Sequence, residues 1–142
     1  MLAKLLRPLA GIVHVITGTE EYAMKRVLVL DDDADLCLVL IETFMMLGAS
    51  ECLQAHSLSE LQKIEKNALQ SDVIVLDINL GPEEPSGIDA YDWLMARAYK
   101  GRIVFLTGHA RSHPLVKKAQ DIAGVQLLEK PTPIENLEVL LR

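Results

Sequence analysis

Short apolar runs that end in polar residues recur along most of the chain. One of them extends from Val73 to Leu76 and leads directly into Asp77. A continuous apolar run of this length is typical of a strand that is buried on both faces, as in a parallel sheet. Four further runs predict strands over residues 27–30, 50–55, 102–106 and 125–128.

Apolar residues at helical spacing fill the stretches between these runs. They predict helices over residues 34–47, 57–68, 86–99 and 114–122, and a last helix from 133 to the C-terminus. Gly48 ends the first of them. Polar caps mark four helix starts: Asp33, Ser57 with Glu60 in a capping box, Ser86, and Thr132 followed by Pro133 and Glu135.

Strands and helices therefore alternate along the sequence, five of each. This alternation predicts one α/β domain with a doubly wound, parallel five-stranded sheet and helices on both faces. The winding that we adopt as the hypothesis is the flavodoxin-like (βα)5 fold, with the strand order 2-1-3-4-5. In this order the first and third strands are neighbours, and ligands bind where the winding reverses, outside the carboxyl ends of the strands. The length of 142 residues fits one such domain.

The carboxyl ends of four predicted strands carry polar residues. Asp31 and Asp32 follow the first strand, and Asp77 ends the third. Thr107 follows the fourth strand, and Lys130 lies just beyond the fifth. Because neighbouring strands lie about 4.8 Å apart, three carboxylates at this edge repel one another. Oxygen ligands of this kind suit a magnesium ion, which relieves the repulsion.

The same residues suit phosphoryl transfer. Asp77 is a carboxylate nucleophile of the kind that forms an aspartyl-phosphate. The metal, the Lys130 ammonium and the Thr107 hydroxyl can each meet one oxygen of the transferred group, and Gly108 leaves room beside it. Taken singly, each residue also has a plain structural interpretation, such as helix capping by the acids after the first strand. Their joint placement at one edge favours the functional interpretation.

Four motifs carry a resemblance to a known family. In this order and spacing, V-L-V-L-D-D-D, V-I-V-L-D, F-L-T-G and E-K-P resemble the receiver domain of two-component response regulators. The resemblance covers about residues 25–142 and leaves 1–24 as an N-terminal extension. It implies that Asp77 is the phosphoacceptor and that Asp31 and Asp32 bind the metal, Mg²⁺ or Mn²⁺. Asn79 would add its backbone carbonyl to the metal ligands.

The resemblance also implies roles for the residues around the phosphoacceptor. Thr107 would be the hydroxyl that moves on phosphorylation, and Lys130 would pair with the phosphate. The Lys130–Pro131 peptide bond would be cis. Asn79 and His109 occupy positions that tune the lifetime of the aspartyl-phosphate in this family.

Two features depart from the family pattern. Leu127 stands three residues before the lysine, where the family usually has an aromatic side chain that changes rotamer with the threonine. The loop after Asp77 is longer than usual, with two prolines and two glutamates over residues 82–85. We expect this loop to restrict access to the site or to contact a partner.

The function that follows is that of a phosphoacceptor response regulator. A sensor histidine kinase or a histidine phosphotransfer protein would donate the phosphoryl group, and the phosphorylated state would alter contacts with a downstream protein target. The protein is expected to be a self-modifying switch rather than a turnover enzyme, located in the cytoplasm. Because the last predicted helix runs to Arg142, we expect a stand-alone receiver. A homodimer is left open.

Three alternatives deserve weight against this function. A degenerate receiver would act as a binding module without phosphorylation, and Leu127 is compatible with that. A flavodoxin-like nucleotide binder needs a loop rich in glycine and hydroxyl residues after the first strand, whereas this loop is acidic. A phosphatase with an Asp-x-Asp nucleophile loop is disfavoured because Asn79 replaces the second acid.

Composition narrows the class of partner. The net charge of −6 and the isoelectric point of about 5.1 disfavour nucleic-acid binding. The sequence holds no apolar run long enough to span a membrane. Cys37 and Cys52 show no metal-ligand spacing and are interpreted as small buried hydrophobic residues in a reducing compartment.

The first predicted helix is apolar on more than one face, through Leu38, Val39, Met45 and Met46. Dense packing against the sheet is the favoured interpretation, and a docking face for a helical partner is the alternative.

Residues 1–24 do not share the regular pattern. Lys4 and Arg7 precede an apolar stretch over residues 9–16, which resembles a secretory signal without its cleavage site. A surface amphipathic helix and a translation start at Met24 are the other two interpretations.

Overall fold

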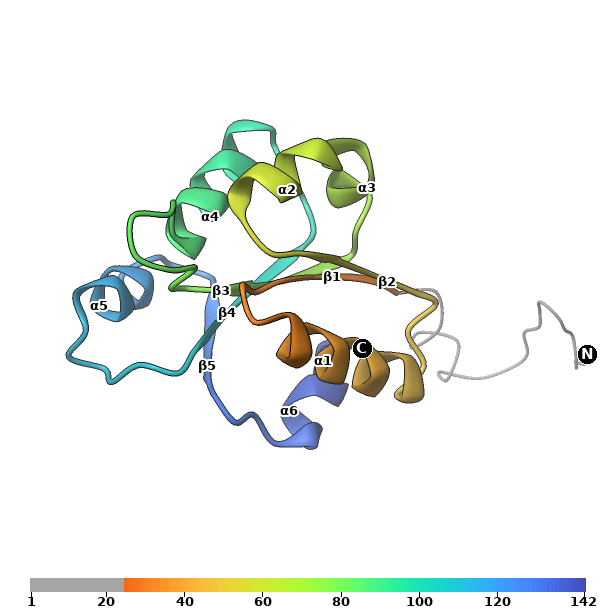
Figure 1. Cartoon of the computed structure of the whole chain (residues 1–142). Coiled ribbons are helices and arrows are strands. Elements are labelled where there is room, and N and C mark those ends of the chain that lie inside the picture. The colour runs from red at the N-terminus through yellow and green to blue at the C-terminus, as the bar shows by residue number, and fades with distance from the viewer. Residues whose placement is uncertain (1–24) are drawn as a thin grey trace, which may run out of the picture.

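The computed structural model describes residues 25–142, and the predictions made for residues 1–24 lie outside this range (Figure 1). The strands are β1 (Arg26–Leu30), β2 (Glu51–Ala55), β3 (Val73–Asp77), β4 (Arg102–Thr107) and β5 (Gln126–Glu129). The helices are α1 (Ala34–Met46), α2 (Leu58–Lys63), α3 (Glu65–Leu69), α4 (Gly87–Ala96), α5 (Pro114–Gln120) and α6 (Ile134–Val139).

All five strands form one parallel sheet in the order β2-β1-β3-β4-β5, so the predicted fold is confirmed. Leu30 pairs with Leu76, and Asp77 pairs with Leu106. This register brings the residues that follow β1 beside the end of β3. The predicted meeting of strand ends at one edge of the sheet is therefore present.

Helices lie over both faces of the sheet (Figure 1), and an apolar cluster fills the space on each face. Leu28, Ile74 and Phe105 face the side covered by α2, α3, α4 and α5. Val29, Val75 and other alternate residues of the same strands face α1 and α6. Since every central strand is buried on both sides, its residues read as continuous apolar runs, which is the pattern that made the strands detectable.

Two helix starts differ from the prediction. The helix expected over 57–68 divides into α2 and α3, because the backbone at Ile64 leaves the helical region, with φ −113° and ψ 34°. Thr132 does not cap the last helix, since its hydroxyl donates to Glu129 O and the helix begins without a side-chain cap. Asp33 and Ser86 do cap their helices.

The favoured interpretation of the first helix is wrong. Leu38, Val39, Met45 and Met46 are between 47% and 73% exposed, so they do not pack against the sheet. The buried side of α1 consists of Cys37, Leu40 and Phe44.

Within residues 25–142, no helix has the length and apolar character that crossing a membrane requires. Cys37 and Cys52 are free thiols. Cys37 is buried as predicted, whereas Cys52 is only partly buried.

Candidate functional site

Two carboxylates and one ammonium group meet at the carboxyl edge of the sheet. The backbone N–H of Asp33 donates to Asp31 Oδ1, and the Asp31 carboxylate is buried. Lys130 Nζ lies 2.8 Å from Asp31 Oδ2 and 3.3 Å from Asp77 Oδ2. Lys130, which directly follows β5, is thus joined to the carboxyl ends of β1 and β3 through charge-assisted contacts.

The environment of Asp77 favours a carboxyl group that holds its proton. The pKa of Asp77 is raised to about 7: burial and then the negative charge of Asp31 raise it, and the Lys130 ammonium opposes the rise. Although burial by itself lowers the pKa of Lys130, its hydrogen bond to Asp31 and the charge of Asp77 raise that pKa above its usual value. Lys130 therefore remains a cation at neutral pH.

The acid cluster fits a divalent cation. Asp31, Asp32 and Asp77 each present one carboxylate oxygen, and these oxygens lie within 4.8 Å of one another. When all are ionised, three negative charges face the single positive charge of Lys130, so the site carries about two unbalanced charges. A cavity of about 400 Å³, lined by these carboxylates and also by Asn79, opens beside them. Hard oxygen ligands of this type are those that Mg²⁺ and Mn²⁺ prefer.

Thr107 positions the site through both its backbone and its side chain. Its carbonyl oxygen accepts the backbone N–H of Lys130 at 2.7 Å, and its hydroxyl oxygen accepts the N–H of His109 at 3.0 Å. The Thr107 side chain is buried and is not part of the cavity lining. The peptide bond between Lys130 and Pro131 is cis, as expected.

Asn79 and His109 form the rim of the cavity. Asn79 Nδ2 donates to His109 Nε2 at 3.2 Å, while Asn79 Oδ1 accepts the N–H of Gly81. The His109 ring packs against that of His113, with centroids 4.7 Å apart and the ring planes tilted by 41°. His113 in turn caps α5 by accepting the N–H of Leu115. Asn79 and His109, the two residues expected to tune the lifetime of the aspartyl-phosphate, therefore contact each other.

Gly87 is a positioning residue that the sequence interpretation missed. A Cβ atom at Gly87 would lie 2.1 Å from the carbonyl oxygen of Asp77, and the Gly87 N–H donates to Ile78 O at 2.7 Å. The loop after Asp77 thus returns to pack backbone against backbone. A glycine in the first turn of a helix, where alanine would be preferred, was the available signal.

The loop itself is exposed over residues 82–85, and Glu83 has a positive φ of 65°. Gly108 has room around it, because a Cβ atom there would lie 3.7 Å from Lys130 Cδ.

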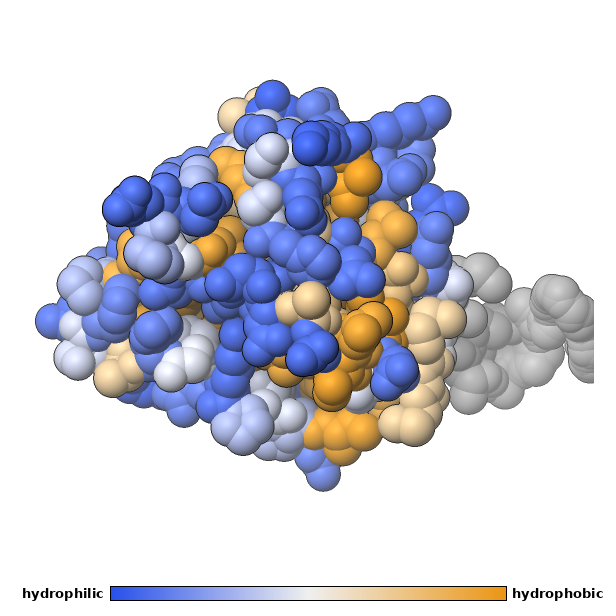
Figure 2. Space-filling model, viewed as in Figure 1, coloured by the Kyte–Doolittle hydropathy of each residue, from blue (hydrophilic) through white to orange (hydrophobic). Residues whose placement is uncertain are grey.

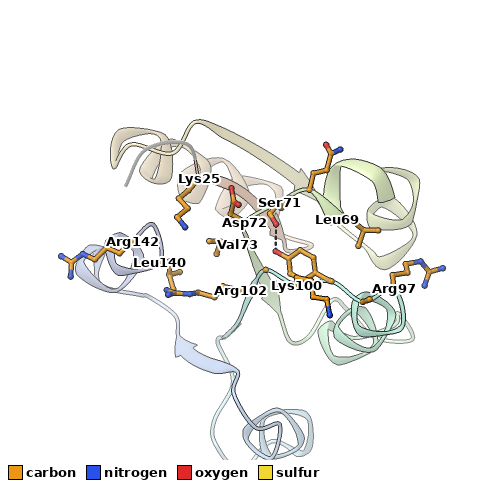
Figure 3. A pocket seen from close by; sticks show the side chains of 14 residues that line it. Lys25, Leu69, Ser71, Asp72, Val73, Arg97, Lys100, Arg102, Leu140 and Arg142 are labelled. Carbon is orange, nitrogen blue, oxygen red and sulfur yellow. Dashed lines mark hydrogen bonds between the residues drawn. The ribbon is translucent and has the colours of Figure 1, made fainter. Parts of the chain in front are cut away.

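A second hollow, of about 510 Å³, lies at the opposite edge of the sheet, where the strands begin (Figure 3). The side chains of Arg97 and Arg142 point away from it in this view. The Asp72 carboxylate accepts the N–H of Arg26, and this bond ties the starts of β1 and β3 together. This hollow is remote from Asp77 and does not contribute to its chemistry.

Comparison with known proteins identifies the family. The family described as "Response regulator receiver domain" matches residues 27–142. The chain belongs to this family. The receiver predicted from the four strand-end motifs is thereby confirmed, and no curated protein matches the chain in sequence.

Solved structures show the same receiver fold. A response regulator protein from Burkholderia pseudomallei, determined with a phosphorylated aspartic acid, a calcium ion and citrate, is 29% identical, with a TM-score of 0.67 over 83% of this chain and 66% of that one. Chemotaxis protein CheY4 of Vibrio cholerae is 28% identical, with a TM-score of 0.66 over 84% of this chain and 97% of its own. A receiver domain protein from Clostridium thermocellum is 23% identical, with a TM-score of 0.69 over 83% and 91%.

The departure at Leu127 has a definite place in this receiver. Leu127 pairs with Phe105 in the β4–β5 ladder and is partly buried against the core cluster on the α5 side. Its side chain is aliphatic and therefore offers neither an aromatic ring nor a polar group at this place.

Proposed function

We propose that this receiver accepts a phosphoryl group on Asp77 from a phosphohistidine and that the modified state changes its contacts with other proteins. One observation carries the proposal. Asp77 is buried at the end of a central strand, yet it borders an open cavity that also holds a fixed cation, Lys130. A merely structural carboxylate at a strand end needs neither the cavity nor two further acids beside it.

The transfer forms one bond and breaks one. An oxygen of the Asp77 carboxylate attacks phosphorus, and the phosphorus–nitrogen bond of the donor breaks. Its electron pair returns to the imidazole, which recovers a proton. Lys130 stabilises the negative charge on the phosphoryl oxygens, because its ammonium already lies 3.3 Å from Asp77. The Thr107 hydroxyl would have to turn from its present bond with His109 N–H to reach the same group.

The metal site supports a requirement for Mg²⁺ or Mn²⁺. Asp31, Asp32 and Asp77 would hold the ion through carboxylate oxygens, and Asn79 through its backbone carbonyl. The bound ion supplies charge neutralisation for the phosphoryl oxygens. Asp31 also orients Lys130, since its Oδ2 atom lies 2.8 Å from Nζ.

The proposed protein is a switch and not a turnover enzyme, because Asp77 is itself the modified group. Its phosphodonor would be a sensor histidine kinase or a histidine phosphotransfer protein, and its output would be a change in binding to a downstream protein. The Burkholderia pseudomallei relative, whose structure contains a phosphorylated aspartic acid and a calcium ion, supports the modification.

The direct experiment is phosphorylation by acetyl phosphate with and without Mg²⁺, followed by intact mass and peptide mapping. We expect one phosphoryl group on Asp77, only when Mg²⁺ is present, and none on the Asp77→Asn variant. Asp72→Asn serves as the matched control, since Asp72 lies at the opposite edge of the sheet. No gain in mass, or the same gain in the Asp77→Asn variant, would overturn the proposal.

A second candidate is a receiver that binds its partners without phosphorylation. The partly buried Leu127, in place of the family's aromatic residue, favours it. The two functions separate in one measurement: partner binding that is unchanged by phosphorylation and by Asp77→Asn would support the second.

A further inference from the structure

The outer face of α1 is an apolar surface that no described residue covers. We define the α1 surface by Leu38, Val39, Met45 and Met46, which are 50%, 56%, 47% and 73% exposed. Figure 2 shows apolar residues gathered over α1 and α6. Exposed apolar side chains grouped in this way mark a site of contact.

The α1 surface continues across a groove to α6. Val39 and Leu40 on one side, and Ile134 and Leu137 on the other, line a hollow of about 210 Å³. The two helices carry four exposed acidic side chains and no basic one, and Lys130, which also lines the groove, is paired with Asp31 and Asp77. An occupant of this surface should therefore combine large aliphatic side chains with positive charge.

The described chain begins beside this surface. Lys25 O accepts hydrogen bonds from the backbone N–H and the hydroxyl of Ser50, at 2.9 Å and 3.1 Å. Ser50 follows the end of α1 by four residues, so residue 25 is held near Met46. Residues preceding it therefore start at one end of the α1 surface.

We propose that residues 1–16 of this chain pack on the α1 surface and the adjoining groove. The stretch contains eight large aliphatic residues, and its charged side chains are Lys4 and Arg7. It thus combines the large aliphatic side chains and the positive charge expected of an occupant of the α1 surface. The packing does not depend on the phosphorylation proposed above.

The connection is long enough for this arrangement. Residues 17–24 can span up to about 27 Å when extended. The 13 residues of α1 extend over roughly 20 Å at helical rise. The apolar stretch can therefore reach every part of the α1 surface from the fixed point at Lys25.

Oxidation of methionine by hydrogen peroxide tests the proposal on the full chain. Met46 is 73% exposed and Met95, on α4, is 40% exposed, so an uncovered Met46 should oxidise faster than Met95. Under the proposal, Met45 and Met46 oxidise severalfold more slowly than Met95. In the double variant Leu6→Asp/Ile12→Asp their rates rise severalfold, while the rate of Met95 does not change.

A matched variant separates apolar packing from added charge. Thr17→Asp/Thr19→Asp introduces the same two charges outside the packed stretch and should leave Met45 and Met46 protected. Oxidation of Met46 faster than Met95 in the unmodified chain would overturn the proposal. So would protection that disappears on dilution, which points to a second copy as the occupant, or a native product that begins at Met24.

Discussion

Lys130 Nζ lies 3.3 Å from Asp77 Oδ2 at the carboxyl edge of the sheet. Asp77 ends β3, and Lys130 follows β5. The same ammonium is 2.8 Å from Asp31 Oδ2, so one cation contacts two buried carboxylates. The pKa of Asp77 depends on this arrangement, because the charge of Lys130 lowers it while burial and Asp31 raise it.

Removal of the ammonium should raise the pKa of Asp77 above its present value of about 7. In a Lys130→Met variant without metal, a ¹³C carboxyl NMR titration should find Asp77 protonated at higher pH than in the unmodified protein. Phosphorylation at pH 7 should slow as a result, since the protonated carboxyl group is not a nucleophile. An Asp77 titration that does not move in the variant would contradict the role given to Lys130. Lys100→Met, at the opposite edge of the sheet, is the control.

Stability should depend on pH through the same group. The folded pKa of Asp77 is raised from 3.8 to about 7, so its contribution to stability is complete below pH 3.8 and is lost as the pH rises through 7. Asp77→Asn removes the free-energy cost of ionising this buried carboxyl group. Without metal at pH 8, the variant should be more stable than the unmodified protein by on the order of 2 kcal/mol, and the difference should shrink toward pH 5.

Urea denaturation at the two pH values measures this difference. Saturating Mg²⁺ should stabilise the unmodified protein more than Asp77→Asn, because ligand binding to the folded state adds stability. Equal stability of the two proteins at pH 8 without metal would show that Asp77 is not held in an unfavourable charged state.

The strands and the edge where they end were predictable because the parallel sheet is buried on both faces. Each strand then appears as an apolar run, and the residue after the run marks its carboxyl end. The run from Val73 to Leu76 and the run from Val104 to Leu106 are of this kind. Pairing in the order 2-1-3-4-5 then places Asp77 and Thr107 at a common edge.

Other features depend on contacts that no local pattern encodes. The break at Ile64 arises from backbone dihedrals within an apolar periodicity that continues from Leu61 to Ala68. Met45 and Met46 have apolar side chains of the kind found in protein cores, yet they are exposed. Which side of an apolar helix is buried depends on what covers it, and the amino-acid pattern of α1 alone did not decide that.

In the site, the sequence pointed to residues with chemistry but missed those that position them. Gly87 acts through close approach of two backbones, and His113 acts as a helix cap whose ring packs at a tilt against His109. Both are tertiary relationships. They become visible only when the loop after Asp77 is traced in space.

Gly87→Ala should displace the backbone at Asp77. The added Cβ atom would meet Asp77 O at 2.1 Å, so the start of α4 has to shift. We expect a loss of about 1–3 kcal/mol in the free energy of unfolding, together with slower phosphorylation. Gly108→Ala is the control, since its Cβ atom would meet Lys130 Cδ at an ordinary 3.7 Å and the fold should tolerate it. Equal stability of the two variants would refute the close approach.

His109 should set the lifetime of the phosphoryl group. Its side chain lines the cavity and is held by Asn79, so His109→Ala would open the cavity to water. We expect phosphorylation by acetyl phosphate to persist and the half-life of the aspartyl-phosphate to fall severalfold, as followed by loss of mass over time. His56→Ala, which alters a side chain bonded to Gln54, should leave the half-life unchanged. A His109→Ala half-life equal to that of the unmodified protein would remove His109 from this role.

The central claim is that Asp77, its neighbouring acids and Lys130 form a site for a phosphoryl group that the rest of the receiver can sense. Titration with beryllium fluoride and Mg²⁺, followed by two-dimensional amide NMR, tests it most directly. We predict that amide signals at Asp77, Thr107 and Lys130 shift, and that Asp77→Asn abolishes the shifts. Signals that stay in place throughout the titration, or that shift equally in the variant, would contradict the account.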